Sequence, residues 1–104
     1  MTKNEHLNQG FKHFSSQEFD KAIECFEEAI KLDPKFDTAY NALAEALNRS
    51  GKLDEAIETA KKMVEISPND PISHTALSRL YVQKGLIDDA EREMAISHQL
   101  AQQQ

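Results

Sequence analysis

The sequence predicts an all-α fold, a right-handed α-solenoid built from three helix–turn–helix repeats with about six helices. A six-residue motif returns with an offset of 34 residues, as FDKAIE at 19–24, LDEAIE at 53–58 and IDDAER at 87–92. Within each copy the apolar residues recur at spacings of three and four, as they do along one face of a helix. No segment supports a strand, so we expect stacked helical hairpins along the 104-residue chain.

The first repeat is expected to form helices over residues 3–15 and 20–32. Thr2 and Glu5 have the spacing of a capping box, in which each side chain bonds the backbone N–H of the other residue. Pro34 closes the unit, because proline cannot continue the hydrogen-bond ladder of a helix. Gln17 occupies the turn position that glycine occupies in the two later repeats.

The second repeat is expected to form helices over residues 37–49 and 54–66. Asp37 should cap the start of its first helix. Gly51 should end that helix, because glycine readily adopts the left-handed conformation found just past helix C-termini. Pro68 should end the second helix. The apolar residues form one stripe on each helix: Tyr40, Leu43, Ala44 and Leu47, then Leu53, Ala56, Ile57, Ala60, Met63 and Val64.

The third repeat is expected to form helices over residues 71–83 and 88–102. Asp70 before Pro71 is a strong start signal, since the carboxylate caps free N–H groups and proline suits the first helical position. Gly85 repeats the turn glycine. The apolar stripes continue through Leu77, Leu80 and Tyr81, then Ile87, Ala90 and Met94.

One hairpin cannot cover both of its apolar sides, so the repeats should stack into one domain over residues 1–104 with a continuous core. Small residues are expected where helices approach closely, and they recur at two repeat positions: Ala22, Ala56 and Ala90, and Gly10, Ala44 and Ser78.

Composition excludes several classes of function. The net charge of −6 repels phosphate backbones, which argues against nucleic-acid binding. No stretch approaches the roughly 20 apolar residues of a membrane span, and the N-terminus has no apolar run of a secretory signal. The one cysteine, Cys25, cannot form an internal disulfide and is expected to be a buried small hydrophobe. We therefore expect a soluble, cytoplasmic protein.

These residues resemble the tetratricopeptide repeat, a family with a 34-residue helix–turn–helix unit. The matching features are the closing Pro34 and Pro68 and the acidic turn residues Asp20, Asp54 and Asp88. The resemblance covers three units: residues 3–36, 37–70 and 71–104. It implies a superhelix whose concave groove, lined by the first helix of each pair, holds a peptide or a segment of another protein. It implies no catalysis and no cofactor.

The two ends depart from the family pattern. The first unit has His6 and His13 where the family prefers large aromatics and Gln9 where it prefers leucine, and Lys12 can stay solvated where Ala46 and Leu80 cannot; this resembles an N-terminal capping unit. Gln102 replaces the last closing proline, and no polar capping helix follows. Three residues are therefore candidates for an uncovered edge: Ile87, Met94 and Ala95. Self-association through this edge and a frayed monomer end are both open readings.

Successive residues of a helix are rotated by about 100° around its axis, so the position of the buried stripe predicts which side chains face the groove. They are Leu7, Phe11 and Phe14 in the first repeat, Asn41, Glu45 and Asn48 in the second, and Thr75, Arg79 and Val82 in the third.

The groove should therefore be apolar at its N-terminal end and rich in amides at its centre. The Leu7, Phe11 and Phe14 stripe could anchor an apolar partner side chain, although such stripes are also typical of cores. Asn41 and Asn48 could bond a peptide backbone or be ordinary solvated residues.

Family members that bind chaperone C-termini hold the terminal carboxylates with a clamp of lysine, asparagine and arginine side chains. The matching positions here read Leu7, Phe11, Ala42, Ile72 and Ala76. None can hold a carboxylate, so we expect no binding to chaperone tails through that clamp.

No group of residues predicts chemistry. His6 and His13 share a helix face but lie roughly 10 Å apart along the axis, too far for one metal ion. His74 falls at the stripe position of Tyr40, so we expect a packed, hydrogen-bonded histidine. Without a nucleophile–base pair, we predict no catalytic residue, no metal site and no enzyme. The expected function is a protein-interaction scaffold or adaptor; the alternative is a scaffold that self-associates through its last helix.

Overall fold

The computed structural model describes residues 1–104 as six α-helices and no strand. Their bounds are α1 (Lys3–Ser15), α2 (Phe19–Leu32), α3 (Asp37–Arg49), α4 (Leu53–Ile66), α5 (Pro71–Lys84) and α6 (Ile87–Gln102). The first helices of the three hairpins start 34 residues apart, and so do the second helices. Every expected helix is present, and no end differs from the prediction by more than one residue.

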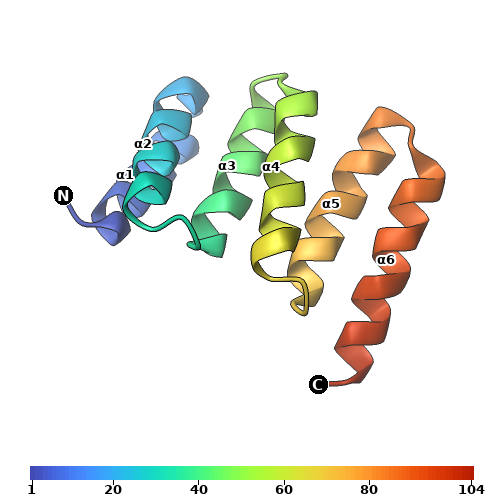
Figure 1. The fold of residues 1–104 in the computed structure, drawn as a ribbon. Coiled ribbons are helices and arrows are strands. Elements are labelled where there is room, and N and C mark those ends of the chain that lie inside the picture. The colour runs from blue at the N-terminus through green and yellow to red at the C-terminus, as the bar shows by residue number, and fades with distance from the viewer.

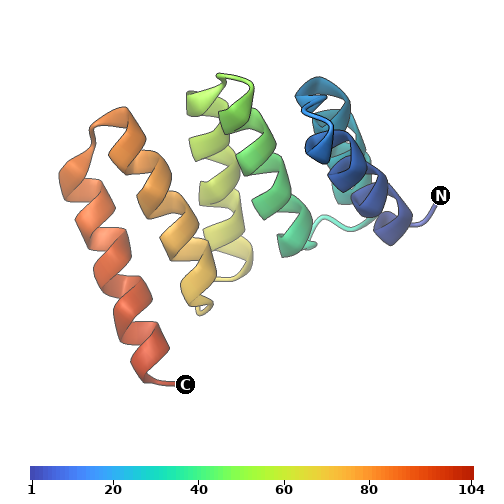
Figure 2. The same cartoon turned by 180° about the vertical axis from the view of Figure 1, so that it is seen from behind.

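The helices form three hairpins in a row, with the chain termini at opposite ends of the molecule (Figure 1). Viewed from behind, α1 and α3 lie in front of α2 and α4 (Figure 2). Each hairpin packs against the next through α2 on α3 and α4 on α5, and the molecule measures 37 × 28 × 19 Å. One cluster of 16 buried apolar residues runs from α1 to α5. The all-α repeat solenoid expected from the sequence is therefore confirmed.

Two of the three side-chain caps expected at helix N-termini are confirmed. Thr2 and Glu5 form both bonds of the capping box, and the Asp70 carboxylate accepts a bond from the Ile72 N–H at 3.0 Å. The prediction that Asp37 caps α3 is wrong. Phe36 occupies the cap position without a side-chain bond, and Asp37 is already inside the helix, where its carboxylate accepts a bond from the Ser67 hydroxyl at 3.0 Å.

The turns inside the three hairpins share one geometry. Gly51 and Gly85 have φ angles of 84° and 86°, as expected for glycine in the left-handed region. Gln17 adopts the same conformation with φ of 62°, which costs a residue with a Cβ atom roughly 1–2 kcal/mol. The backbone bond that closes each turn spans five residues in all three hairpins, and the first hairpin therefore forms this turn without a glycine.

Small residues lie where the helices of a hairpin approach closely, as expected. A Cβ atom on Gly10 would come within 2.4 Å of the ring of Phe26, which is fully buried. Ala22 and Ala56 are also fully buried, and Ala90 is nearly so. At the N-terminal end of the molecule Lys12 stays exposed, whereas its counterparts in the later hairpins are buried.

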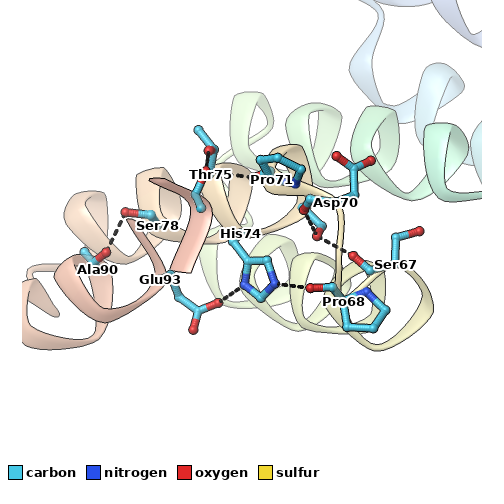
Figure 3. A network of polar contacts seen from close by, with 11 residues as sticks. Ser67, Pro68, Asp70, Pro71, His74, Thr75, Ser78, Ala90 and Glu93 are labelled. Carbon is cyan, nitrogen blue, oxygen red and sulfur yellow. Dashed lines mark hydrogen bonds and ion pairs between the residues drawn. The ribbon is translucent and has the colours of Figure 1, made fainter. Parts of the chain in front are cut away.

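The third hairpin has a polar interior built around His74 (Figure 3). This side chain is 5% exposed, and its Nε2 atom donates a bond to the Pro68 carbonyl at 2.7 Å. Its Nδ1 atom lies 2.9 Å from a carboxylate oxygen of Glu93 on α6. The prediction of a packed, hydrogen-bonded histidine is confirmed.

Buried hydroxyl groups extend this network along α5 and α6. The Ser73 hydroxyl lies 2.7 Å from both the Ser67 and the Asp70 carbonyl oxygens and shares its one proton between them, and Ser78 donates to the Ala90 carbonyl at 2.7 Å. No buried side-chain nitrogen or oxygen in the molecule lacks a hydrogen-bond partner. A polar core of this kind is tolerated because every group that loses water gains a partner.

Candidate functional site

Five of the expected groove residues meet in one hollow of about 340 Å³ that is lined only by α1, α3 and α5. Phe11 and Phe14 come from α1, Asn41 and Glu45 from α3, and Arg79 from α5. Thr38 and Ala42 complete the lining. The first helix of every hairpin therefore contributes to this hollow.

A smaller hollow of about 170 Å³ adjoins the first one. It is lined by Pro71, Ile72, Thr75, Ala76, Asn41 and Arg79. Because Asn41 and Arg79 border both hollows, the two form one continuous surface across α1, α3 and α5, which we call the groove.

Phe11 provides an exposed apolar platform at one end of the groove. Its side chain is 43% exposed, and its ring packs edge-on against Phe26 with centroids 5.3 Å apart and planes at 64°. Since Phe26 is fully buried beside Gly10, the ring of Phe11 has a rigid support. A rigid aromatic surface of this kind loses little conformational entropy when a partner covers it.

Phe14 extends the apolar end of the groove but is held more deeply. It is half-buried and packs edge-on against Phe19, with centroids 5.3 Å apart and planes at 73°. The guanidinium of Arg49 lies 5.5 Å from the centroid of the Phe14 ring, within the range of a cation–π contact.

A carboxylate at the centre of the groove pairs with two arginines, one that lines the groove and one beside it. One carboxylate oxygen of Glu45 lies 3.3 Å from Nε of Arg49, and the other lies 3.1 Å from a terminal nitrogen of Arg79. Glu45 and Arg79 thus form an ion pair between equivalent positions of neighbouring hairpins. Both arginines are more than half exposed, so each ion pair contributes only about 0–1 kcal/mol to stability.

Four residues expected to line the groove lie elsewhere or are already hydrogen-bonded, and one of them, Val82, is exposed but borders neither hollow. Leu7 is 8% exposed and belongs to the core cluster, because an aliphatic side chain at the border of the buried stripe gains by turning inward. Asn48 is half-buried and borders neither hollow. Thr75 borders the smaller hollow, but its hydroxyl is hydrogen-bonded to Ser97 at 2.7 Å.

Sequence reasoning did not assign Thr38 or Ile72 to this surface, or Arg49 to its border. Thr38 and Arg49 lie three residues before Asn41 and four residues after Glu45, so helical spacing would have found both. Ile72 precedes Ala76 by four residues and is 60% exposed. Its position in the groove became evident only from the exposure of so large an aliphatic side chain, which the structure shows.

The expected C-terminal edge is only partly apolar at its surface. Ile87 is 48% exposed, Ala95 is exposed and Met94 is half-buried. Val82 and Leu86 are also exposed near the α5–α6 turn. Glu91 occupies the position that the buried Ile57 has in α4, so this end of the molecule carries charge where a further hairpin would pack.

Another hollow, of about 370 Å³, lies between α2, α3 and α4. Ile30, Tyr40 and Leu43 form its apolar lining, and two glutamates and two lysines surround them. It contains none of the residues that the sequence predicted to line the groove. Its lining comes from two hairpins only, whereas the lining of the groove comes from all three.

The remaining ionisable groups form no second site. Cys25 is half-buried rather than fully buried as expected, and burial raises the pKa of its thiol. No three histidine, cysteine or acidic side chains converge as metal ligands do. No helix is both long enough and apolar enough to cross a bilayer.

Comparison with known proteins places the chain in a family. Family models described as tetratricopeptide repeat match residues 8–71 and 49–103. The chain belongs to the tetratricopeptide repeat family, whose members are typically non-enzymatic modules for protein interaction. A curated relative, the STIP1 homolog of Dictyostelium discoideum, is 55% identical over 31 residues, which are 30% of this chain and 6% of that protein.

Solved structures support the fold. MamA superimposes with a TM-score of 0.92 at 24% identity, covering 98% of this chain and 60% of that one. The first tetratricopeptide repeat domain of Spaghetti (RPAP3), solved with the HSP90 peptide SRMEEVD, gives a TM-score of 0.88 at 17% identity, covering 95% of this chain and 79% of that one. These likenesses establish the architecture; the ligand is a property of the Spaghetti domain.

Proposed function

We propose that the protein binds a segment of another protein in the groove across α1, α3 and α5. The observation that carries this proposal is the convergence of Phe11, Phe14, Asn41 and Arg79, from three hairpins, on one hollow. Apolar and polar groups thus lie side by side on a preformed surface, as they do in most binding sites.

Each part of the groove has a distinct use in binding. Phe11 and Phe14 offer an apolar anchor site, and a few such anchors supply most of the energy of protein association. The exposed amide of Asn41 can both donate to and accept from a peptide backbone. Because the groove needs side chains from all three hairpins, we propose that residues 1–104 act as one domain with repeats 3–36, 37–70 and 71–104.

The proposed partner is not held by the carboxylate clamp of the chaperone-binding members. Of the five matching positions, Leu7, Ala42 and Ala76 are buried, and Phe11 and Ile72 are exposed but apolar. We therefore expect no micromolar binding of a chaperone tail that depends on its terminal carboxylate. Titration with a free-acid tail peptide and its C-terminal amide would detect such binding.

The proposal is tested by affinity capture from an extract of the organism that supplies the gene. The groove variant carries Phe11→Ala, Asn41→Ala and Arg79→Ala. A matched variant carries changes of the same kinds outside the groove, namely Leu32→Ala, Asn69→Ala and Arg92→Ala. We expect partners that bind the wild type and the matched variant but not the groove variant. Equal capture by all three proteins, each shown to be folded, would contradict the proposal.

Exposure of Ile87 also favours a second candidate function, self-association through the C-terminal edge. Association of two copies would bury the exposed aliphatic side chains near the α5–α6 turn, which is favourable. Sedimentation should then give a mass that rises with concentration and is lost on changing Ile87 and Met94 to glutamate. A monomer at several hundred micromolar would exclude this function.

A further inference from the structure

We infer that the groove selects a segment in which an acidic residue lies between apolar residues, with the carboxylate held by Arg79. This inference rests on the proposed function, because it names the chemistry of the partner that the same groove would bind.

The charge of the groove carries the first step. The charged side chains that line it are Arg79 and Glu45, and Arg49 bonds the same carboxylate from beside the groove, so two cations share one carboxylate. The chain as a whole has 18 acidic and 12 basic residues and a net charge of −6. Together with the neighbouring Arg49, the groove is therefore locally positive on an otherwise acidic molecule, which favours an anionic group at this place and disfavours it elsewhere.

Arg79 has donors free for a partner. One of its terminal nitrogens bonds Glu45 at 3.1 Å, and 59% of its side chain remains exposed. A guanidinium has five N–H donors in a planar fork that matches a carboxylate. A partner carboxylate can therefore bind Arg79 without displacing Glu45.

The position of Arg79 determines where the acidic residue must lie. Arg79 borders both hollows, with Phe11 and Phe14 on one side and Ile72 and Ala76 on the other. A segment that crosses the groove meets an apolar surface, then the guanidinium, then a second apolar surface. An acidic residue with apolar neighbours on both sides satisfies all three, whereas a segment of charged residues leaves Phe11 and Ile72 facing water.

The two hollows differ in size, which predicts an asymmetric segment. The hollow beside Phe11 measures about 340 Å³ and accepts a large side chain such as leucine, methionine or phenylalanine. The hollow beside Ile72 measures about 170 Å³, so the apolar side chain that enters it should be the smaller of the two.

The test uses a phage-displayed library of random 12-residue peptides, fused at their C-termini so that no free carboxylate is present. The library is selected against the wild type, against Arg79→Glu and against Arg92→Glu, a control on α6 outside the groove. Chosen peptides are then synthesised with amidated ends, and their affinities are measured by fluorescence anisotropy against these proteins, Arg79→Ala and Phe11→Ala. Circular dichroism confirms that each variant is folded.

We expect wild-type protein and Arg92→Glu to enrich peptides with aspartate or glutamate between apolar residues. Arg79→Ala should weaken their binding about ten-fold or more, as loss of a charge-assisted bond does. Arg79→Glu should enrich lysine or arginine at the same place.

The outcomes separate this inference from the proposed function. Peptides that lose binding with Phe11→Ala but show no preference for an acidic residue would overturn the inference and leave groove binding intact. Peptides indifferent to both Phe11→Ala and Arg79→Ala, or no enriched peptide at all, would contradict the proposed function and this inference together.

Discussion

The second and third hairpins have nearly the same helices but different interiors. Where the second hairpin has Ala39, Ala44 and Met63, all buried, the third has Ser73, Ser78 and Ser97 at the equivalent positions. The second interior is held by apolar contact, which depends on volume but little on direction. The third adds to its apolar contacts a set of buried hydrogen bonds, each of which requires a particular partner.

One pair of positions shows what the repeat retains. In the second hairpin the Tyr40 hydroxyl donates to the Pro34 carbonyl at 3.0 Å, and in the third the His74 Nε2 atom donates to the Pro68 carbonyl at 2.7 Å. The donors are 34 residues apart, and so are the acceptors. The repeat therefore preserves a bond from the first helix to the preceding proline turn, although the residue that makes it changes.

Removing the two donors should show the difference between the two hairpins most clearly. His74→Leu leaves the Pro68 carbonyl and the Glu93 carboxylate without their partner, so we expect a loss of about 3 kcal/mol in unfolding free energy. Tyr40→Phe loses one exposed bond and should cost about 1 kcal/mol or less. Urea unfolding followed by circular dichroism measures both. Equal losses would mean that burial of the third network contributes nothing.

Two substitutions of Glu93 test the role of the network partner. Glu93→Gln leaves an amide beside Nδ1 of His74 that can accept a bond from it or donate one to it, so we expect a loss below about 1 kcal/mol. Glu93→Ala leaves Nδ1 unpaired, and it should cost about 2 kcal/mol. Thr59, the equivalent residue of the second hairpin, bonds only its own helix, so Thr59→Ala serves as the control. Similar results for both Glu93 variants would contradict the network.

The turns of the first and second hairpins can be compared in the same way. Gln17 adopts a positive φ without being glycine, so Gln17→Gly should stabilise the protein by about 0.5–1 kcal/mol. Gly51→Ala should destabilise it by a similar amount, although no atom lies within 4 Å of the added Cβ. Thermal unfolding of the two variants checks this, and a destabilising Gln17→Gly would show that its side chain contributes more than the strain costs.

The smallest expected effect is on the stability of the folded protein at acidic pH. Hydrogen bonds from the Thr2 backbone, from His13 and from Lys3 lower the pKa of Glu5, Glu18 and Asp33 respectively, all in the first hairpin. The stability that these three bonds give the folded protein is complete above the ordinary carboxyl pKa of about 4, and it is lost as pH falls through the lowered pKa values.

Lys3→Gln should therefore reduce the loss of stability that acid causes. The measurement is the urea midpoint at pH 7 and at pH 3 for wild type and variant, with Lys62→Gln as the control. An unchanged difference between the two pH values would exclude a role for the Lys3–Asp33 pair.

The sequence predicted the architecture well because the evidence for it is local. Helical periodicity, the Thr2–Glu5 capping box, Asp70 before Pro71 and the turn glycines each act within a few residues. Asp37 failed as a cap because the same residue types that cap a helix also stabilise its first turn, and sequence spacing does not distinguish the two positions.

The groove was predictable only in outline. Helical spacing correctly brought Phe11, Asn41, Glu45 and Arg79 to one surface, but it also assigned Leu7 there. A side chain at the border between the buried and exposed faces can turn either way. Its direction depends on the neighbouring hairpin, which the pattern of one helix does not describe.

The amino-acid sequence by itself determined the period, the six helices, the small residues between them and the membership of a repeat family, since these follow from contacts within one hairpin. Only the tertiary structure decided that Leu7 is buried, that Glu45 reaches Arg79 of the next hairpin, and that two hollows meet at Asn41. These features arise from the angle at which hairpins pack. That angle is set by side chains far apart in the chain.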